Sequence, residues 1–286
     1  MAHLRNKLYF QLLDDRKQQS KIDLFNRIIM KLRYAILLLV CTISYAKAQN
    51  ARFVNQGVIE FEKKINAYAL LKDQAKKYPD NIWSTQALEQ YQKNNPQFKT
   101  LKSELVFKNN QTFFNPIPDD NATNNWLNSF GSAKQSNIIL TNLKTETSIN
   151  QKSIYEETYL VKDSIRKINW KITDEFRTIA GYDCRRANAL IMDSIYVVAF
   201  YSETIPVSGG PETFSGLPGM ILGVALPREH ITWFATKVSD VEVTDAQLKV
   251  PSKGKPVTKK QLSDILKSAL KDWGNYASDI LKSADM

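Results

Sequence analysis

The sequence predicts a mainly β fold: a strongly curved antiparallel sheet with helices inserted early and appended late. Three observations predict it. After Pro96, most segments alternate apolar and polar residues, which is the period of strands with one buried face. Short polar gaps separate successive runs, as they do in hairpins. Residues 65–95 and 258–284 change instead to helical spacing. We expect about eight to ten strands, and a sheet of that size must curl or close.

Alternation places the individual strands along the chain. One-sided strands are expected at 52–63, 101–108, 155–161 and 168–172. Residues 195–201 and 231–238 are apolar on both faces, which predicts central strands that are covered on both sides. Residues 115–131 contain several Pro, Asp and Asn residues and predict a long loop.

The early helical segment, residues 65–95, is expected to form two short helices. Trp83, Ala87 and Tyr91 are four residues apart, so they share one helix face. Pro79 begins a Pro-Asp-Asn break between the two helices.

The late segment, residues 258–284, is expected to be an amphipathic helix. Thr258 and Gln261 have the spacing of a capping box. Gly274 weakens the middle by about 1 kcal/mol, so two helical pieces are an alternative. The polar face mixes Lys and Asp evenly, which favours docking on the protein's own sheet over lying on a membrane.

The first 48 residues have the features of an export signal. Residues 30–33 are basic, an apolar run extends over 34–45, and an Ala-x-Ala site ends at Ala48, before Gln49. The run is shorter than the ~20 apolar residues that span a bilayer. We therefore expect a signal peptide at 30–48 and no transmembrane segment after its removal. Cys41 follows Val40, which is a poor match to a lipidation site.

Residues 1–29 are mostly polar and are expected to be unstructured, either upstream of the true start at Met30 or as a long n-region. A single domain is then expected at 49–286. The first 48 residues hold nine of the 39 Lys and Arg and three of the 29 Asp and Glu, which leaves a net charge of +4. No basic stripe accompanies that small charge, so we expect no nucleic-acid binding.

The mature chain offers few catalytic residue types. It has one histidine, His230, and one cysteine, Cys184, so no disulfide and no His/Cys metal cluster can form within it. No Gly-x-Ser-x-Gly elbow, phosphate-binding loop or dinucleotide fingerprint is present. We expect no metal and no cofactor.

Residues 206–223 form the most distinctive stretch of the chain. Five of the ten glycines and three of the ten prolines fall within it. Leu217-Pro218-Gly219-Met220 predicts a type II turn, in which glycine supplies a positive φ. The segment is expected to be an irregular backbone with fixed conformation that folds against the sheet or across its mouth. Its motif residues are Gly209, Gly210, Pro211, Phe214, Gly216, Leu217, Pro218, Gly219, Met220 and Ile221.

Gly-Leu-Pro-Gly-Met-Ile at 216–221 resembles the signature of the GLPGLI family of exported Bacteroidota proteins, with Met220 in place of leucine. Residues 179–187, 199–206 and 210–211 extend the resemblance, which covers roughly 168–240. It implies an open half-barrel or bowl in the periplasm, at the outer membrane or secreted. The family has no established biochemical role.

Each candidate residue has a structural and a functional interpretation. Cys184 is either a small apolar side chain facing inward on a strand or half of a thiol dyad with His230. His230 is otherwise a turn or edge residue. Leu217 and Met220 either pack in the core or are presented to a ligand or partner. We favour the structural interpretation in each case.

Three functions from different classes remain open. The first is a non-enzymatic envelope protein that binds a ligand or a protein partner through the sheet and the 206–223 loop. The second is a hydrolase in which Glu203 and Glu212 supply the acid–base groups. The third is a structural envelope component. Ser164 and Ser194, each in an Asp-Ser-Ile sequence, are candidate O-glycosylation sites.

Overall fold

The computed structural model describes residues 27, 29–35, 53–78, 82–118, 127, 130–134 and 136–285. The chain divides into two compact units, Met1–Arg52 and Phe53–Met286. In the first unit, residues 29–35 are helical. The expected apolar run beyond residue 35, the cleavage site at Ala48 and Gln49, and the break at 79–81 lie outside the described residues. Within the described part, no helix is both long enough and apolar enough to cross a membrane.

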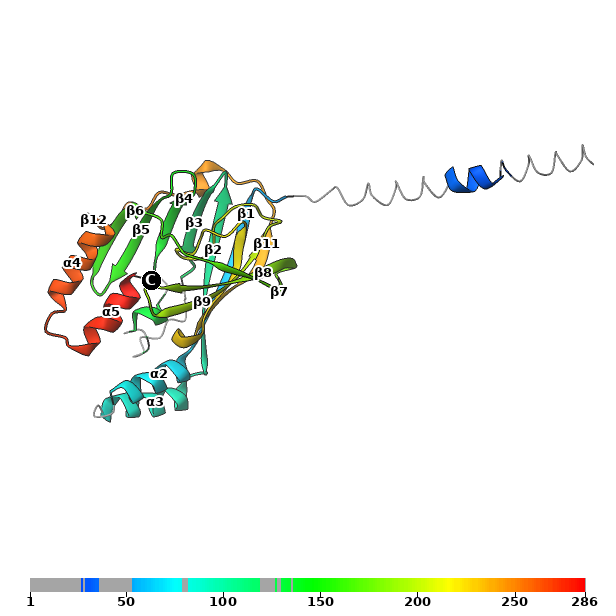
Figure 1. Ribbon diagram of the computed structural model, residues 1–286. Coiled ribbons are helices and arrows are strands. Elements are labelled where there is room, and N and C mark those ends of the chain that lie inside the picture. The colour runs from blue at the N-terminus through cyan, green and yellow to red at the C-terminus, as the bar shows by residue number, and fades with distance from the viewer. Residues whose placement is uncertain are drawn as a thin grey trace, which may run out of the picture. The chain divides into compact units, whose positions relative to one another are not determined.

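The second unit contains one 12-stranded sheet (Figure 1). In chain order the strands are β1 (Gln56–Asn66), β2 (Phe98–Lys108), β3 (Gln111–Pro116), β4 (Ile138–Asn142), β5 (Thr147–Ile154), β6 (Glu157–Ser164), β7 (Lys171–Ile179), β8 (Tyr182–Ile191), β9 (Ile195–Ser202), β10 (Met220–Leu226), β11 (Ile231–Ser239) and β12 (Lys255–Val257). Their order across the sheet is β12-β6-β5-β4-β3-β2-β1-β11-β10-β9-β8-β7. Only the β12–β6 pair is parallel among the described strands.

The mainly β class is confirmed, but the strong curvature expected from the sequence is wrong. The sheet is open, has β12 and β7 as its edges, and is not strongly curled. It also has more strands than expected. Curling is one way for a large sheet to bury its apolar face. Here a loop and two helices cover that face instead, so the sheet stays open.

The early and late helices occupy different places (Figure 1). Between β1 and β2 the chain forms α2 (Ala67–Lys77) and α3 (Ile82–Asn94). The C-terminal segment forms two helices, α4 (Lys259–Ala269) and α5 (Asn275–Asp285), in place of one. Gly274, with φ +53°, lies in the break between them. Thr258 and Gln261 form the expected capping box at the start of α4.

Two strand boundaries differ from those expected. Residues 168–170 precede β7 rather than opening a strand, and the Trp170 indole Nε1 donates to the Ser215 carbonyl at 2.9 Å. That contact holds the segment against the 206–223 loop. Residues 220–223 begin β10 and so belong to the sheet rather than to the loop. The irregular connection between β9 and β10 is therefore residues 203–219, here called the β9–β10 loop.

One face of the sheet, the inner face, carries the core and divides into two halves. On β1 and β2 this face presents Ile59, Phe61, Leu105 and Phe107, each at most 1% exposed. The sealed half comprises β1, β2 and β7–β11, and the β9–β10 loop packs on it. The cavity half comprises β3–β6 and β12, and α4 packs on it through a separate apolar cluster with Tyr159 and Val161.

Candidate functional site

A cavity of about 700 Å³ lies over the cavity half of the sheet. Its lining comes from β3–β6, from residues 209–215 of the β9–β10 loop, from the β8–β9 turn, and from α4 and α5. Small-molecule sites typically occupy about 300–1,000 Å³. The cavity is thus large enough for a small ligand, and four separate parts of the fold converge on it.

The floor of the cavity is a row of polar side chains on the inner face. Thr112, Thr141 and Ser148 are directly opposite one another on β3, β4 and β5. Residues that are opposite in an antiparallel ladder point to the same side of the sheet. Asn150 and Lys152 continue this face along β5, because side chains alternate with a period of two. At these positions the inner face is polar, whereas Phe114 of β3 and Ile139 of β4, two positions away on the same face, are buried and apolar.

Two of the floor residues are buried without full hydrogen bonding. Asn150 is 7% exposed, and its Oδ1 has no hydrogen-bond partner among the residues that the structure describes. Lys152 is 6% exposed, and its Nζ donates to the Ala284 carbonyl on α5. An ammonium has three donors, so Lys152 keeps donors that this carbonyl does not use. Leaving a buried polar atom unpaired costs about 1–3 kcal/mol, which makes this arrangement costly in a purely structural floor.

Glu212 lies in the wall of the cavity, near two buried lysines. Burial raises its pKa, while the nearby Lys63, the hydrogen bond from Asn137 Nδ2 at 2.9 Å and Lys152 act against that shift. Burial lowers the pKa of Lys63 and of Lys152 to about 8, and Glu212 acts to raise both. Glu212 also has φ +52°, in the left-handed region that is uncommon for non-glycine residues. The β9–β10 loop thus brings a strained, buried carboxylate within electrostatic range of two buried ammonium groups.

The roof of the cavity comes from the C-terminal helices and combines an apolar patch with charged residues. Leu262 and Leu266 of α4 and Leu281 and Ala284 of α5 face it. Phe214 of the β9–β10 loop and Met192 of the β8–β9 turn add apolar side walls. The cavity therefore has a polar floor and, on its helical side, an apolar patch bordered by charged residues.

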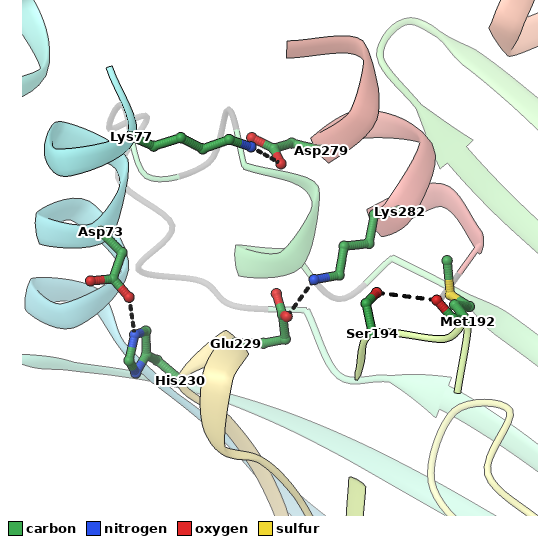
Figure 2. Close-up of polar contacts among 8 residues, drawn as sticks. All are labelled: Asp73, Lys77, Met192, Ser194, Glu229, His230, Asp279 and Lys282. Atoms are coloured by element: carbon green, nitrogen blue, oxygen red, sulfur yellow. Dashed lines mark hydrogen bonds and ion pairs between the residues drawn. The ribbon is translucent and has the colours of Figure 1, made fainter. Parts of the chain in front are cut away.

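Ion pairs hold α5 in its place beside the cavity (Figure 2). Asp279 accepts from Lys77 of α2 at 2.5 Å. Lys282 pairs with Glu229, in the turn before β11, at 2.6 Å. The rings of Tyr78 and Tyr276 stack with their centroids 4.2 Å apart. Helix α5 is thus attached to the α2 side of the unit as well as to the sheet.

The β9–β10 loop is fixed by its own backbone hydrogen bonds. Gly216 N donates to Ser208 O at 3.1 Å, and Met220 N donates to Ile205 O at 2.9 Å. Leu217 and Met220 are at most 1% exposed, and Phe214 is 6% exposed. These side chains pack in the core, so contact with an outside partner would require the loop to leave the sheet.

The type II turn expected at 217–220 is wrong. Gly219 does not have a positive φ; Gly216 does, at +95°. A Cβ added at Gly219 would lie 2.7 Å from the Ser202 carbonyl carbon and 3.0 Å from the Glu203 Cα. Glycine at 219 is needed because two backbone segments approach closely, not because of its dihedral angles.

Cys184 and His230 have separate surroundings. Cys184 is fully buried on β8, and burial raises the pKa of its thiol to about 12. His230 lies at the end of a 3₁₀ turn with φ +57°, and its Nε2 is 2.7 Å from Asp73 Oδ2 of α2 (Figure 2). Neither side chain lines the cavity. The inward interpretation of Cys184 is confirmed, and His230 has an acidic partner that its sequence neighbourhood does not reveal.

The remaining predicted residues are distributed between the cavity and the surface. Glu203 is exposed and accepts from the Tyr201 hydroxyl at 3.3 Å, whereas Glu212 lines the cavity. Ser164 ends β6, where its N–H and hydroxyl donate to Asp163. Ser194 is exposed in the β8–β9 turn and donates to Met192 O at 3.1 Å (Figure 2). Among the described residues, no group of three His, Cys, Asp or Glu is placed to hold a metal ion.

Sequence reasoning identified Glu212 and the loop but missed the floor of the cavity. Residues 147–154 read Thr-Ser-Ile-Asn-Gln-Lys-Ser-Ile and lack the apolar alternation by which a strand is recognised. Asn150 and Lys152 were therefore given no position. Once β5 is known, the polar residues at 148, 150 and 152 are conspicuous, because they share a buried face.

A family model described as "Protein of unknown function (Porph_ging)" matches residues 190–223. This is the GLPGLI family, so the resemblance seen at 216–221 is confirmed over that segment. No curated protein matches the chain.

Two solved structures of PNGF-II, in space groups C2 and P21, are similar to this chain at 13% and 14% identity, with TM-scores of 0.47 and 0.46. They cover 73% and 74% of this chain, which spans about a third of their length, 32% and 33%. A likeness this distant carries no argument about function.

Proposed function

We propose that this chain, which carries the GLPGLI family segment, is an exported binding protein that holds a small ligand between its sheet and its C-terminal helices. One observation carries the proposal: the cavity floor contains a buried Asn150 acceptor with no partner, beside Lys152 with donors to spare. A ligand that satisfies both would recover the free energy that these groups cost when they are left unpaired.

Binding is favoured over hydrolysis by the positions of the carboxylates. Glycoside hydrolysis, the carboxylate chemistry considered above, uses two facing acidic groups. Glu203 does not line the cavity. Of the other acids that do line it, Asp279 is paired with Lys77, and Asp285 with Arg166 at 3.3 Å. Glu212 is left without a second free carboxylate among the described lining residues.

Native mass spectrometry of the protein purified from its own cell envelope tests the proposal. We expect a discrete added mass that is released on denaturation. In Thr141→Trp the new ring would fill the space above the floor, and this adduct should be lost. Thr145→Trp, at the exposed β4–β5 turn, is the matched control and should keep it. An unmodified mass in the wild-type protein, or an adduct that survives in Thr141→Trp, would rule out this cavity as the site.

Export remains part of the proposal. The signal peptide at 30–48 predicts a mature N-terminus at Gln49 and a location in the periplasm, at the outer membrane or outside the cell. N-terminal peptide mapping of fractionated cells checks this. An intact N-terminus from the cytoplasmic fraction would contradict it. A bare polypeptide mass would likewise exclude glycosylation at Ser164 and Ser194.

A further inference from the structure

The two surfaces of the cavity differ in what they can bind. The floor offers hydroxyls, an amide and an ammonium on β3, β4 and β5, whereas α4 and α5 contribute a group of aliphatic side chains, Leu262, Leu266 and Leu281, that is bordered by charged residues of the same helices. A wholly polar ligand would leave the leucines against polar atoms. A wholly apolar ligand would leave Asn150 and Lys152 unsatisfied and desolvated further. The cavity therefore suits a ligand with one polar end and one apolar body.

The charges around the cavity decide the sign of the polar end. Its lining contains six basic residues (Lys152, Arg166, Lys259, Lys260, Lys267 and Lys282) and three acidic ones (Glu212, Asp279 and Asp285). Two of these are paired with residues outside the lining: Lys282 with Glu229, and Asp279 with Lys77. Setting this cation and this anion aside leaves the excess of positive charge unchanged. An anion is favoured in such a site, because opposite charge compensates the excess of cationic groups, among which Lys152 is buried.

Lys152 is the residue best placed to receive that anion. It is on the floor, and within the described part of the chain its one acceptor is the Ala284 carbonyl. Lys63 is equally buried, but it donates to Lys134 O at 2.6 Å, lies over the Trp233 ring and does not line the cavity. Glu212 is therefore near both lysines, while only Lys152 adjoins the open space.

We infer that the ligand is an anionic amphiphile, whose carboxylate or phosphate contacts Lys152 and whose hydrocarbon body lies against Leu262, Leu266 and Leu281. This inference rests on the proposed function and names the chemical class of its ligand. Charge-assisted hydrogen bonds to a carboxylate or phosphate are among the strongest that a lysine makes. The unpaired Asn150 Oδ1 adds a requirement for a donor near the charged group, such as a hydroxyl.

A chain-matched series of probes tests the ligand class by calorimetry, below the concentrations at which micelles form. The series is decanoate, decyl phosphate, decan-1-ol and decyltrimethylammonium. We expect both anions to bind at least tenfold more tightly than the alcohol, and the cation not to bind. An equal or tighter affinity for the alcohol would overturn the anionic class, while it would leave the cavity as a binding site. Failure of both anions to bind would also overturn the inference; the adduct measured by native mass spectrometry then decides the proposed function separately.

Two lysine variants locate the anion. Lys152→Met should reduce the affinity for decanoate to that for decan-1-ol. Lys63→Met, a change of the same kind at a lysine outside the cavity, should leave the difference between the two probes in place. If both variants behave like the wild type, Lys152 is not the anion contact.

A further experiment tests the contact with Asn150: 3-hydroxydecanoate should bind more tightly than decanoate to the wild type, and the two should bind equally to Asn150→Leu. Equal affinities in the wild type would remove the donor requirement.

Discussion

The sealed half and the cavity half of the sheet belong to one continuous hydrogen-bonded ladder but are covered in different ways. On the sealed half, the β9–β10 loop fits closely enough that a glycine is required at 219. On the cavity half, α4 and α5 cover polar strands, and a cavity of about 700 Å³ remains between these helices and the sheet. Among the described residues, unpaired buried polar atoms occur in both halves, at Ser103, Ser202 and Trp233 of the sealed half and at Asn150 of the cavity half. The sealed half nevertheless fills its space, whereas the cavity half gives up packing contacts and so loses stability. Proteins accept such a loss of stability mainly where a site requires it.

The family segment, residues 190–223, follows the sealed half: it runs from the end of β8 through β9 and the loop into β10. Of its motif residues at 216–221, Leu217, Met220 and Ile221 are explained by core packing, Gly219 by a close backbone approach and Gly216 by its positive φ. Most of the cavity lining lies outside the segment, on β3–β6 and on the C-terminal helices. The motif therefore specifies how the loop seals the sheet, and the cavity is lined mostly by residues that the motif does not include.

The largest expected effect comes from breaking the sealed half at Gly219. In Gly219→Ala the new Cβ would collide with the Ser202 carbonyl and the Glu203 backbone, which cannot rotate away. We expect a loss of at least about 3 kcal/mol in the free energy of unfolding, or no folded protein. Gly216→Ala, in the same loop, has room for its Cβ near Trp170 but a strained φ, and should cost about 1–2 kcal/mol. Equal losses measured by urea denaturation would contradict the close-approach explanation.

A pair of leucine truncations compares the two halves directly. Leu217 is 1% exposed in the sealed core, so Leu217→Ala should cost about 3 kcal/mol. Leu262 is also buried but borders the cavity, so Leu262→Ala removes fewer contacts and should cost about 2 kcal/mol, at the low end for a buried leucine. Ligand affinity should instead fall more in Leu262→Ala than in Leu217→Ala. If Leu262→Ala destabilises as much as Leu217→Ala, the cavity is not open in solution.

The same contrast explains how much the sequence could predict. Alternation places Leu101, Ser103, Leu105 and Phe107 on one face of β2, and the buried face of the structure agrees. The capping box at Thr258 depends on local spacing and was also predictable. Strand β5 has no such pattern, because its inward side chains are polar. Its burial depends on α4 and α5, more than a hundred residues later, and no local signal reports it.

The β9–β10 loop shows a different limit of prediction. Its glycines and prolines identify a fixed backbone, yet the reason for glycine at 219 was misassigned to a turn. The structural reason is the proximity of Ser202, which precedes it by 17 positions across the loop. Residue type alone does not distinguish a glycine required by its own φ from one required by a neighbouring backbone.

The buried lysines predict how stability depends on pH. Each has a folded pKa of about 8 against an ordinary value of 10.5, so above pH 8 the unfolded chain binds more protons than the folded one. The free energy of unfolding should therefore rise with pH from about 8. Above pH 9 the raised pKa of Cys184 acts in the opposite direction, since the unfolded thiol ionises first. Urea denaturation between pH 7 and 9 measures this rise.

Lys152→Met should raise the free energy of unfolding at pH 7, by up to roughly 3 kcal/mol, and should remove about half of the rise with pH. The charges that act on Lys152 are Glu212, Asp285, Arg166 and Lys259, and all are kept in this variant. Lys63→Met should have a similar effect on stability, and only Lys152→Met should weaken anion binding. If Lys152→Met destabilises the protein at pH 7, the lysine is a structural ion-pair partner and not a group held available for a ligand.

The smallest effect concerns Cys184, where we expect almost no reaction. Its thiol, with a pKa of about 12 in place of 9, exposes about a thousandfold less thiolate at pH 8 than an ordinary cysteine. Iodoacetamide should therefore leave the Cys184 peptide unmodified in the time that alkylates it fully in urea, as peptide mass spectrometry can measure. Ser263→Cys, in the lining of the cavity, is the matched probe and should react in the folded protein. Decanoate should slow that reaction and leave Cys184 unchanged. Rapid alkylation of Cys184 would mean that the sealed half opens, and the contrast between the two halves would then be one of dynamics rather than of packing.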